Sequence, residues 1–381
     1  MKRFPFFLIP LVITGCSPVN PPVHVKGDLY VAAWYAAYAS GGYDTFKDHY
    51  WLFDEINPVW YNLNPDYFED GQAPIVHTYN AEKDKNAIIT LARKHGIKLV
   101  PSIQNWGENN FDDQVLVKII QDPGKRAKHV REIVDLVTEN GYDGIDIDYE
   151  ALRTSARGDF SAFIAELGEE LHKRGKLLSV AVYAKTFDAQ WAGAGAQDWA
   201  ELAKYADSLK IMGYDFHWST QHPGPLAPLD WLEKVLIYAQ GIPEVKGKLI
   251  VGLPLYGLNW EAWKTSDDRG PAASEAMYEG DKGAIALRNK YKSEVKRDNT
   301  RHYPCNCNFS TNVEPYFIYY DEAGKKHIVY YQNAKATRAR LELIKKYRHL
   351  VKGITFWRLG REDPEIWQVV AEYSKSITGE K

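Results

Sequence analysis

Four acidic residues lie close together in the run Asp-Gly-Ile-Asp-Ile-Asp-Tyr-Glu: Asp143, Asp146, Asp148 and Glu150. Alternate side chains of a β-strand face the same side, so Asp146, Asp148 and Glu150 share one face and apolar residues occupy the other. Three carboxylates within about 13 Å repel one another, and at least one is expected to hold a proton near neutral pH. A protonated carboxyl at a strand end could protonate a leaving oxygen. Asp143 has the opposite parity and is expected to be structural.

Two other interpretations of this segment compete with acid catalysis. A solvent-exposed acidic loop is disfavoured by the interleaved isoleucines. A metal site of hard oxygen ligands remains open from spacing alone, although we expect neither a metal nor a cofactor. The pair Cys305 and Cys307 lacks the further Cys or His spacing of a metal site, and we expect no catalytic role for it.

The elements that must position the acidic strand form a regular series. Apolar runs typical of strands alternate with amphipathic stretches typical of helices. The expected strands cover 29–35, 58–62, 98–103, 144–149, 177–182, 208–213, 249–254 and 353–357. This alternation predicts a (β/α)8 TIM barrel, with Glu150 at the C-terminal mouth where barrel active sites are built. An open doubly wound sheet is the alternative, weakened because no Gly-rich phosphate loop follows the first strand.

The spacing breaks once, between strand seven and the helix that follows it. Two aromatic-rich runs, 316–320 and 328–331, flank the turn signal Asp-Glu-Ala-Gly and indicate a hairpin. We therefore expect a small α+β insertion over 259–333, with the barrel formed by 28–258 and 334–377.

The N-terminus indicates export. A basic start and a short apolar run end at Gly15 and Cys16, which resembles the lipobox of bacterial lipoproteins. The resemblance implies a signal peptide over 1–15, lipidation of Cys16 and a proline-rich tether over 16–27. An ordinary secretory signal is the alternative. We expect a lipid-anchored protein of the cell envelope, outside the cytoplasm.

The amino-acid composition indicates which classes of binding partner to expect. A net charge of −3 gives no electrostatic basis for nucleic-acid binding. The chain is 13% aromatic, with 12 Trp and 25 Tyr, and such rings can stack on the apolar faces of sugars, although any single one is more often core. Trp106, Trp218 and Trp260 follow expected strand ends, and one or two of them are expected to contact sugar. We expect a monomer.

The motifs resemble those of glycoside hydrolase family 18, the family of chitinases and related endo-N-acetylglucosaminidases. Asp143, Asp146, Asp148 and Glu150 match its pattern Asp-x-x-Asp-x-Asp-x-Glu on strand four. The segments 211–215, 252–257 and 353–357 are similar to its motifs on strands six, seven and eight. Departures occur at 102–105, where the family usually has Ser-x-Gly-Gly, and at Leu258, where Arg is frequent. These departures leave chitin, peptidoglycan and N-glycan open as substrates.

The resemblance implies substrate-assisted catalysis at N-acetylglucosamine. Glu150 is then the proton donor, Asp148 binds the acetamido N–H, and Asp146 tunes Asp148 through a shared proton. Tyr214 helps to position the acetamido group. The implied substrate-binding residues are Met212, Asp215, Tyr256 and Trp357. A non-catalytic sugar-binding protein on the same fold is the alternative, disfavoured by the presence of Glu150.

Overall fold

The structure is a computed structural model that describes residues 29–68, 72–108, 110–220, 222–261, 273–297 and 313–378. The predicted signal peptide and tether, Cys16, Cys305 and Cys307 lie outside these residues. None of the helices in the described ranges is long and apolar enough to cross a membrane.

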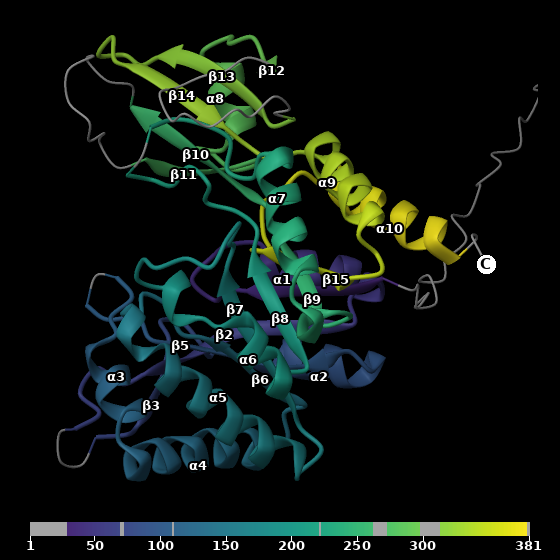
Figure 1. The fold of residues 1–381 in the computed structure, drawn as a ribbon. Coiled ribbons are helices and arrows are strands. Elements are labelled where there is room, and N and C mark those ends of the chain that lie inside the picture. The colour runs from purple at the N-terminus through teal and green to yellow at the C-terminus, as the bar shows by residue number, and fades with distance from the viewer. Residues whose placement is uncertain are drawn as a thin grey trace, which may run out of the picture.

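The described chain forms a closed barrel of parallel strands, which confirms the predicted fold (Figure 1). Strand β1 pairs with both β15 and β2, and this double pairing closes the barrel. The barrel strands are β1 (Tyr30–Tyr35), β2 (Glu55–Leu63), β4 (Lys98–Leu99) with β5 (Ser102–Gln104), β6 (Gly144–Asp148), β7 (Leu177–Tyr183), β8 (Ser208–Met212), β9 (Leu249–Pro254) and β15 (Val351–Trp357). A short strand, β3 (Ile75–His77), pairs antiparallel with β2.

The third barrel strand differs from the continuous run predicted over 98–103. It is divided into β4 and β5 around Pro101. Proline has no N–H to donate to a ladder, so it interrupts the pairing. The Pro101 carbonyl still accepts from the Asp146 N–H at 2.9 Å, which keeps this strand in register with β6.

Helices cover the outside of the barrel. Asp122 caps one of them, α4, because its side chain accepts a hydrogen bond from the Lys125 N–H. The isoleucines of β6 point outward and are fully buried beneath this layer. The helices are α1 (Gly42–His49), α2 (Lys85–His95), α3 (Gln114–Ile120), α4 (Pro123–Glu139), α5 (Arg157–His172), α6 (Trp199–Tyr205), α7 (Leu229–Gln240), α9 (Ala334–Lys346) and α10 (Glu365–Thr378).

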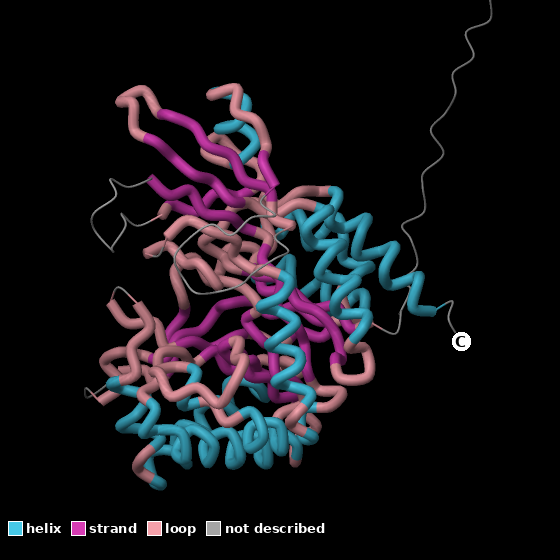
Figure 2. The backbone as a smooth tube through the Cα atoms, turned by 45° about the horizontal axis from the view of Figure 1, so that its top comes forward, coloured by secondary structure: helices cyan, strands magenta, loops and turns pink. Residues whose placement is uncertain are grey.

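A second sheet follows β9 and lies beyond the end of the barrel, as Figure 2 shows. Its strand order is β11-β10-β14-β13-β12, and β13 and β14 form the predicted hairpin. Its strand β10 begins at Tyr256, inside the range 28–258 that the sequence assigned to the barrel. Its elements are β10 (Tyr256–Glu261), β11 (Ser274–Met277), α8 (Ala284–Lys290), β12 (Lys296–Arg297), β13 (Pro315–Tyr320) and β14 (Lys326–Tyr330).

A buried ion pair joins this second sheet to the barrel. Glu314 directly precedes β13, and its carboxylate accepts from the backbone N–H groups of Leu226 and Ala227 at 2.8 and 2.7 Å. The same carboxylate is paired with Arg340 of α9, and both side chains are fully buried. Arg340 also donates to the Ala227 carbonyl. The barrel loop, the barrel helix and the inserted sheet therefore share one polar junction.

Candidate active site

A cleft of about 1610 Å³ opens at the C-terminal ends of the barrel strands. The predicted residues that line it are Asp148, Glu150, Met212, Tyr214, Asp215 and Trp357. Its described lining residues all come from the barrel. The inserted sheet borders a smaller neighbouring cavity of about 390 Å³, to which it contributes Glu275 and Met277.

Glu150 is the second residue after the end of β6; it lines the cleft and is partly buried. Its main chain is held by Asn105, whose amide accepts from the Glu150 N–H at 2.8 Å and donates to the Glu150 carbonyl at 3.0 Å. Burial raises the pKa of Glu150 to about 7, with a hydrogen bond from Tyr183 lowering it and Asp215 raising it. A carboxyl with this pKa can hold a proton near neutral pH and release it during a reaction.

Asp148 lies on the same strand face as Glu150 and is 7% exposed. Burial, the charge of Glu150 and the charge of Asp146 raise the pKa of Asp148 well above its usual range. Asp148 and Glu150 therefore titrate as a coupled pair rather than independently.

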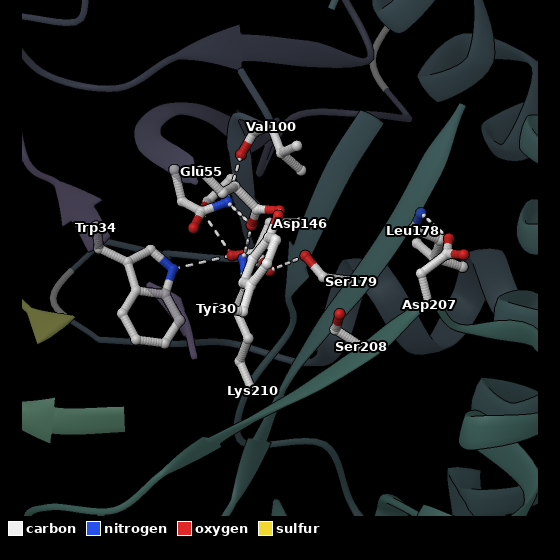
Figure 3. Close-up of polar contacts among 12 residues, drawn as sticks. Tyr30, Trp34, Glu55, Val100, Asp146, Leu178, Ser179, Asp207, Ser208 and Lys210 are labelled. Atoms are coloured by element: carbon white, nitrogen blue, oxygen red, sulfur yellow. Dashed lines mark hydrogen bonds and ion pairs between the residues drawn. The ribbon is translucent and has the colours of Figure 1, made fainter. Parts of the chain in front are cut away.

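Asp146 lies deeper, inside the barrel, and is fully buried (Figure 3). The register places Ser102 of β5 and Ser179 of β7 beside it, and both hydroxyls donate to its carboxylate. The Trp34 indole N–H donates at 2.9 Å and the Lys210 ammonium lies 3.0 Å away. Burial acts to raise the pKa of Asp146, but Lys210 and these hydrogen bonds outweigh it and lower the pKa. These contacts therefore favour the ionised form of Asp146.

Tyr214 and Asp215 line the side of the cleft next to the carboxylates, whereas the predicted substrate-binding residue Tyr256 is not among the lining residues. The Tyr256 hydroxyl donates to Asp215, and the Tyr256 ring contacts Tyr214 edge-on with centroids 6.2 Å apart. Burial raises the pKa of Asp215 to about 6, although its side chain still reaches solvent. Tyr256 reaches the cleft through Asp215, and its other face packs on the inserted sheet.

Aromatic rings surround the remaining space of the cleft. Trp357 is partly buried and contacts Trp34 edge-on, with centroids 5.9 Å apart and planes at 71°. Trp106 and Trp218 line the cleft, whereas Trp260 is buried against the inserted sheet. Trp260 belongs to β10, so it follows a strand end in sequence but turns away from the barrel mouth. Further exposed aromatic residues in the cleft are Tyr38, Tyr79 and Trp191.

Several residues of this site were absent from the sequence prediction: Trp34, Asn105, Tyr183 and Lys210. A signal existed for Lys210, because it is a charged residue between the apolar residues Leu209 and Ile211 of a buried strand. Asp143 lies at the base of β6, where its carboxylate accepts from the Leu99 N–H at 2.8 Å, away from the cleft. No group of three or more His, Cys, Asp or Glu arranged for a metal ion occurs in the described parts of the chain.

Replacing Tyr183 by Phe is expected to move the basic limb of the pH profile upward. The Tyr183 hydroxyl stabilises the ionised form of Glu150, so its loss raises the pKa of Glu150 and keeps the acid protonated to higher pH. We expect the basic limb of the kcat/KM pH profile to move upward by about one pH unit. Tyr238→Phe is the control, because the Tyr238 ring packs on Trp199 and does not line the cleft. A downward shift for Tyr183→Phe would contradict the assignment.

Comparison with known proteins places this site in a family. The profile "Glycosyl hydrolases family 18" matches residues 35–362. The chain is 26% identical over 328 residues to the uncharacterized glycosylase YvbX of Bacillus subtilis, covering 83% of this chain and 88% of that protein. Solved structures of similar fold include a chitinase from Chromobacterium violaceum (TM-score 0.75, 24% identity, 91% and 98% of the two chains) and the spore cortex-lytic enzyme SleL from Bacillus cereus (TM-score 0.76, 21% identity, 92% and 75%). The chain belongs to glycosyl hydrolase family 18 and is a glycosidase.

Proposed function

We propose that this glycosidase cleaves β-1,4 linkages at N-acetylglucosamine by substrate-assisted catalysis, with retention of anomeric configuration. The observation that carries the proposal is the pairing of two buried carboxyl groups with raised pKa values in the cleft. Glu150 has a pKa of about 7, and Asp148 lies beside it on the same strand face. This arrangement supports one proton donor and one group that stabilises a developing positive charge.

In the proposed mechanism these groups act in the following order. Glu150 protonates the glycosidic oxygen, and the carbonyl oxygen of the substrate's own acetamido group attacks the anomeric carbon. The glycosidic C–O bond breaks as the ring of an oxazolinium ion closes. Asp148 accepts a hydrogen bond from the acetamido N–H, and Tyr214 orients the acetamido group. Glu150 then takes a proton from a water molecule that opens the ring.

The proposed substrate is a polymer that contains N-acetylglucosamine linkages. The similar proteins carry the names of a chitinase and of a spore cortex-lytic enzyme. Chitin-like oligomers are the first choice, and peptidoglycan or N-glycan is the second. Mass spectrometry of products from chitooligosaccharides and peptidoglycan, digested side by side, tests the proposal. Cleavage of neither polymer would favour the alternative of a non-catalytic sugar-binding protein.

We also propose that the mature protein is held at the cell envelope by a lipid on Cys16. The lipobox-like sequence before this residue supports the proposal. Metabolic labelling with a fatty acid should tag the wild type and leave Cys16→Ala unlabelled. Equal labelling of both proteins would exclude lipidation at Cys16.

A further inference from the structure

A lysine lies inside the barrel beneath the catalytic carboxylates. Lys210 of β8 is fully buried, and its Nζ atom lies 2.7 Å from Glu55 Oε1 and 3.0 Å from Asp146 Oδ1. The ammonium also lies over the Trp34 ring, 5.6 Å from its centroid. Figure 3 shows Lys210 between the two carboxylates, which come from different strands. A buried cation with two buried anions is costly to build, so its role at this position requires explanation.

The hydrogen-bond partners of Asp146 disfavour protonation of its carboxylate. Oδ1 faces the Lys210 ammonium and Oδ2 faces the Trp34 indole N–H, and both of these groups can only donate. A proton on either oxygen would have to point at Ser179 or Ser102, each of whose hydroxyls would then have to turn and accept. No hydrogen bond joins Asp146 to Asp148 in the described structure. The proposal below therefore departs from the shared proton that the family resemblance implies for this pair.

The second carboxylate has its own donors. Glu55 Oε2 accepts from the Tyr30 hydroxyl at 2.8 Å, and Oε1 accepts from the Asn57 amide at 2.8 Å. Lys210 thus compensates Asp146 without leaving Glu55 unsatisfied. The titratable groups that face the Asp146–Lys210–Glu55 cluster are Tyr30, Asp148, Glu150, Tyr214 and Lys352.

We propose that Lys210 is a positioning residue that holds Asp146 ionised throughout the reaction, so that the proton of the carboxylate cluster stays on Asp148 and Glu150. Asp146 then acts as a fixed negative charge behind Asp148. This charge keeps the proton on the two groups that face the substrate. The inference rests on the proposed function only for its catalytic consequence, because the ionisation of Asp146 is measurable without substrate.

The test compares two variants that differ at Lys210 alone. Glu55→Gln keeps the Lys210–Asp146 pair. Glu55→Gln with Lys210→Met removes one negative and one positive charge, so it preserves the net charge of the cluster while depriving Asp146 of its cation. The readout is nuclear magnetic resonance of protein labelled with carbon-13 in the aspartate carboxyl groups. The Asp146 signal is identified as the one missing from Asp146→Asn.

The Asp146 signal is expected to stay at its ionised position in the wild type and in Glu55→Gln, over the whole pH range in which the protein is folded. In the double variant it is expected to titrate. A wild-type Asp146 signal that titrates together with Asp148 would overturn the proposal. So would an ionised Asp146 in the double variant, since the serine and Trp34 hydrogen bonds would then suffice without Lys210. Should the double variant fail to fold, the wild-type titration still decides whether Asp146 shares a proton.

The catalytic consequence is read from kcat/KM on a soluble chitooligosaccharide. In the double variant a proton on Asp146 removes the negative charge that favours protonation of Glu150. The basic limb of the kcat/KM pH profile should therefore move to lower pH by about one unit. Glu55→Gln should keep the limb near its wild-type position. An unchanged limb in a double variant whose Asp146 titrates would refute the catalytic role. A wild type inactive on every N-acetylglucosamine polymer would refute the proposed function instead, and the carboxyl titration would still decide the state of Asp146.

Discussion

Replacing Glu150 by Gln is expected to lower kcat by about 100- to 10,000-fold, or more, with little change in melting temperature. General acid–base catalysis contributes about this much, equivalent to about 3–5 kcal/mol of transition-state stabilisation. Gln keeps the shape of the side chain and removes its transferable proton. The main-chain contacts of Glu150 with Asn105 do not involve the substituted group, so the strand end should keep its position.

The measurement is steady-state hydrolysis of a chitooligosaccharide, with binding of the same sugar followed by calorimetry. Glu244→Gln is a matched control, because Glu244 is exposed and precedes β9 at the opposite end of the barrel. The control should retain wild-type turnover. Wild-type hydrolysis by Glu150→Gln would show that another group supplies the proton.

Replacing Asp148 by Asn is expected to lower kcat by about 100- to 1,000-fold. This is the typical loss when one preorganised group that stabilises transition-state charge is removed. Asn can still hydrogen-bond the acetamido group but carries no charge opposite the oxazolinium ion. A substrate with a free amine in place of the acetamido group should be very poor for the wild type, because the internal nucleophile is absent. A thiazoline analogue of the intermediate should inhibit.

Asp143→Asn is the matched control, since it makes the same exchange at the base of the same strand. The Asn oxygen can still accept from the Leu99 N–H, so turnover should persist. Equal hydrolysis of acetylated and deacetylated substrates would argue for an external nucleophile in place of substrate assistance.

The sequence predicted much of the fold because its signals were local. Alternation along β6 was enough to place three carboxylates on one face, and turn residues were enough to locate the hairpin of β13 and β14. The division of the third strand at Pro101 was also visible in principle. The predicted start of the insertion, residue 259, lies after the start of β10 at Tyr256. Only one residue separates β10 from β9, so the sequence shows no clear break between them.

The site was less predictable where it depends on pairing between distant strands. Lys210 meets Glu55 and Asp146 only because barrel closure brings β2, β6 and β8 around one interior layer. The Asn105 contact with Glu150 depends in the same way on the register of β5 with β6. Single-sequence periodicity carries no information about such partners. The roles of the predicted site residues remain predictions until the variants above are measured.

The Glu314–Arg340 junction determines how the molecule should unfold. Removing one partner of a buried ion pair leaves an uncompensated charge and costs about 3–5 kcal/mol, a large part of the stability of an ordinary domain. Excision of 259–333 would take away Glu314 and leave Arg340 buried in the barrel wall. We therefore expect that the inserted sheet cannot be removed without destabilising the barrel. Barrel and insertion are expected to unfold as one cooperative unit, so calorimetry should record a single transition.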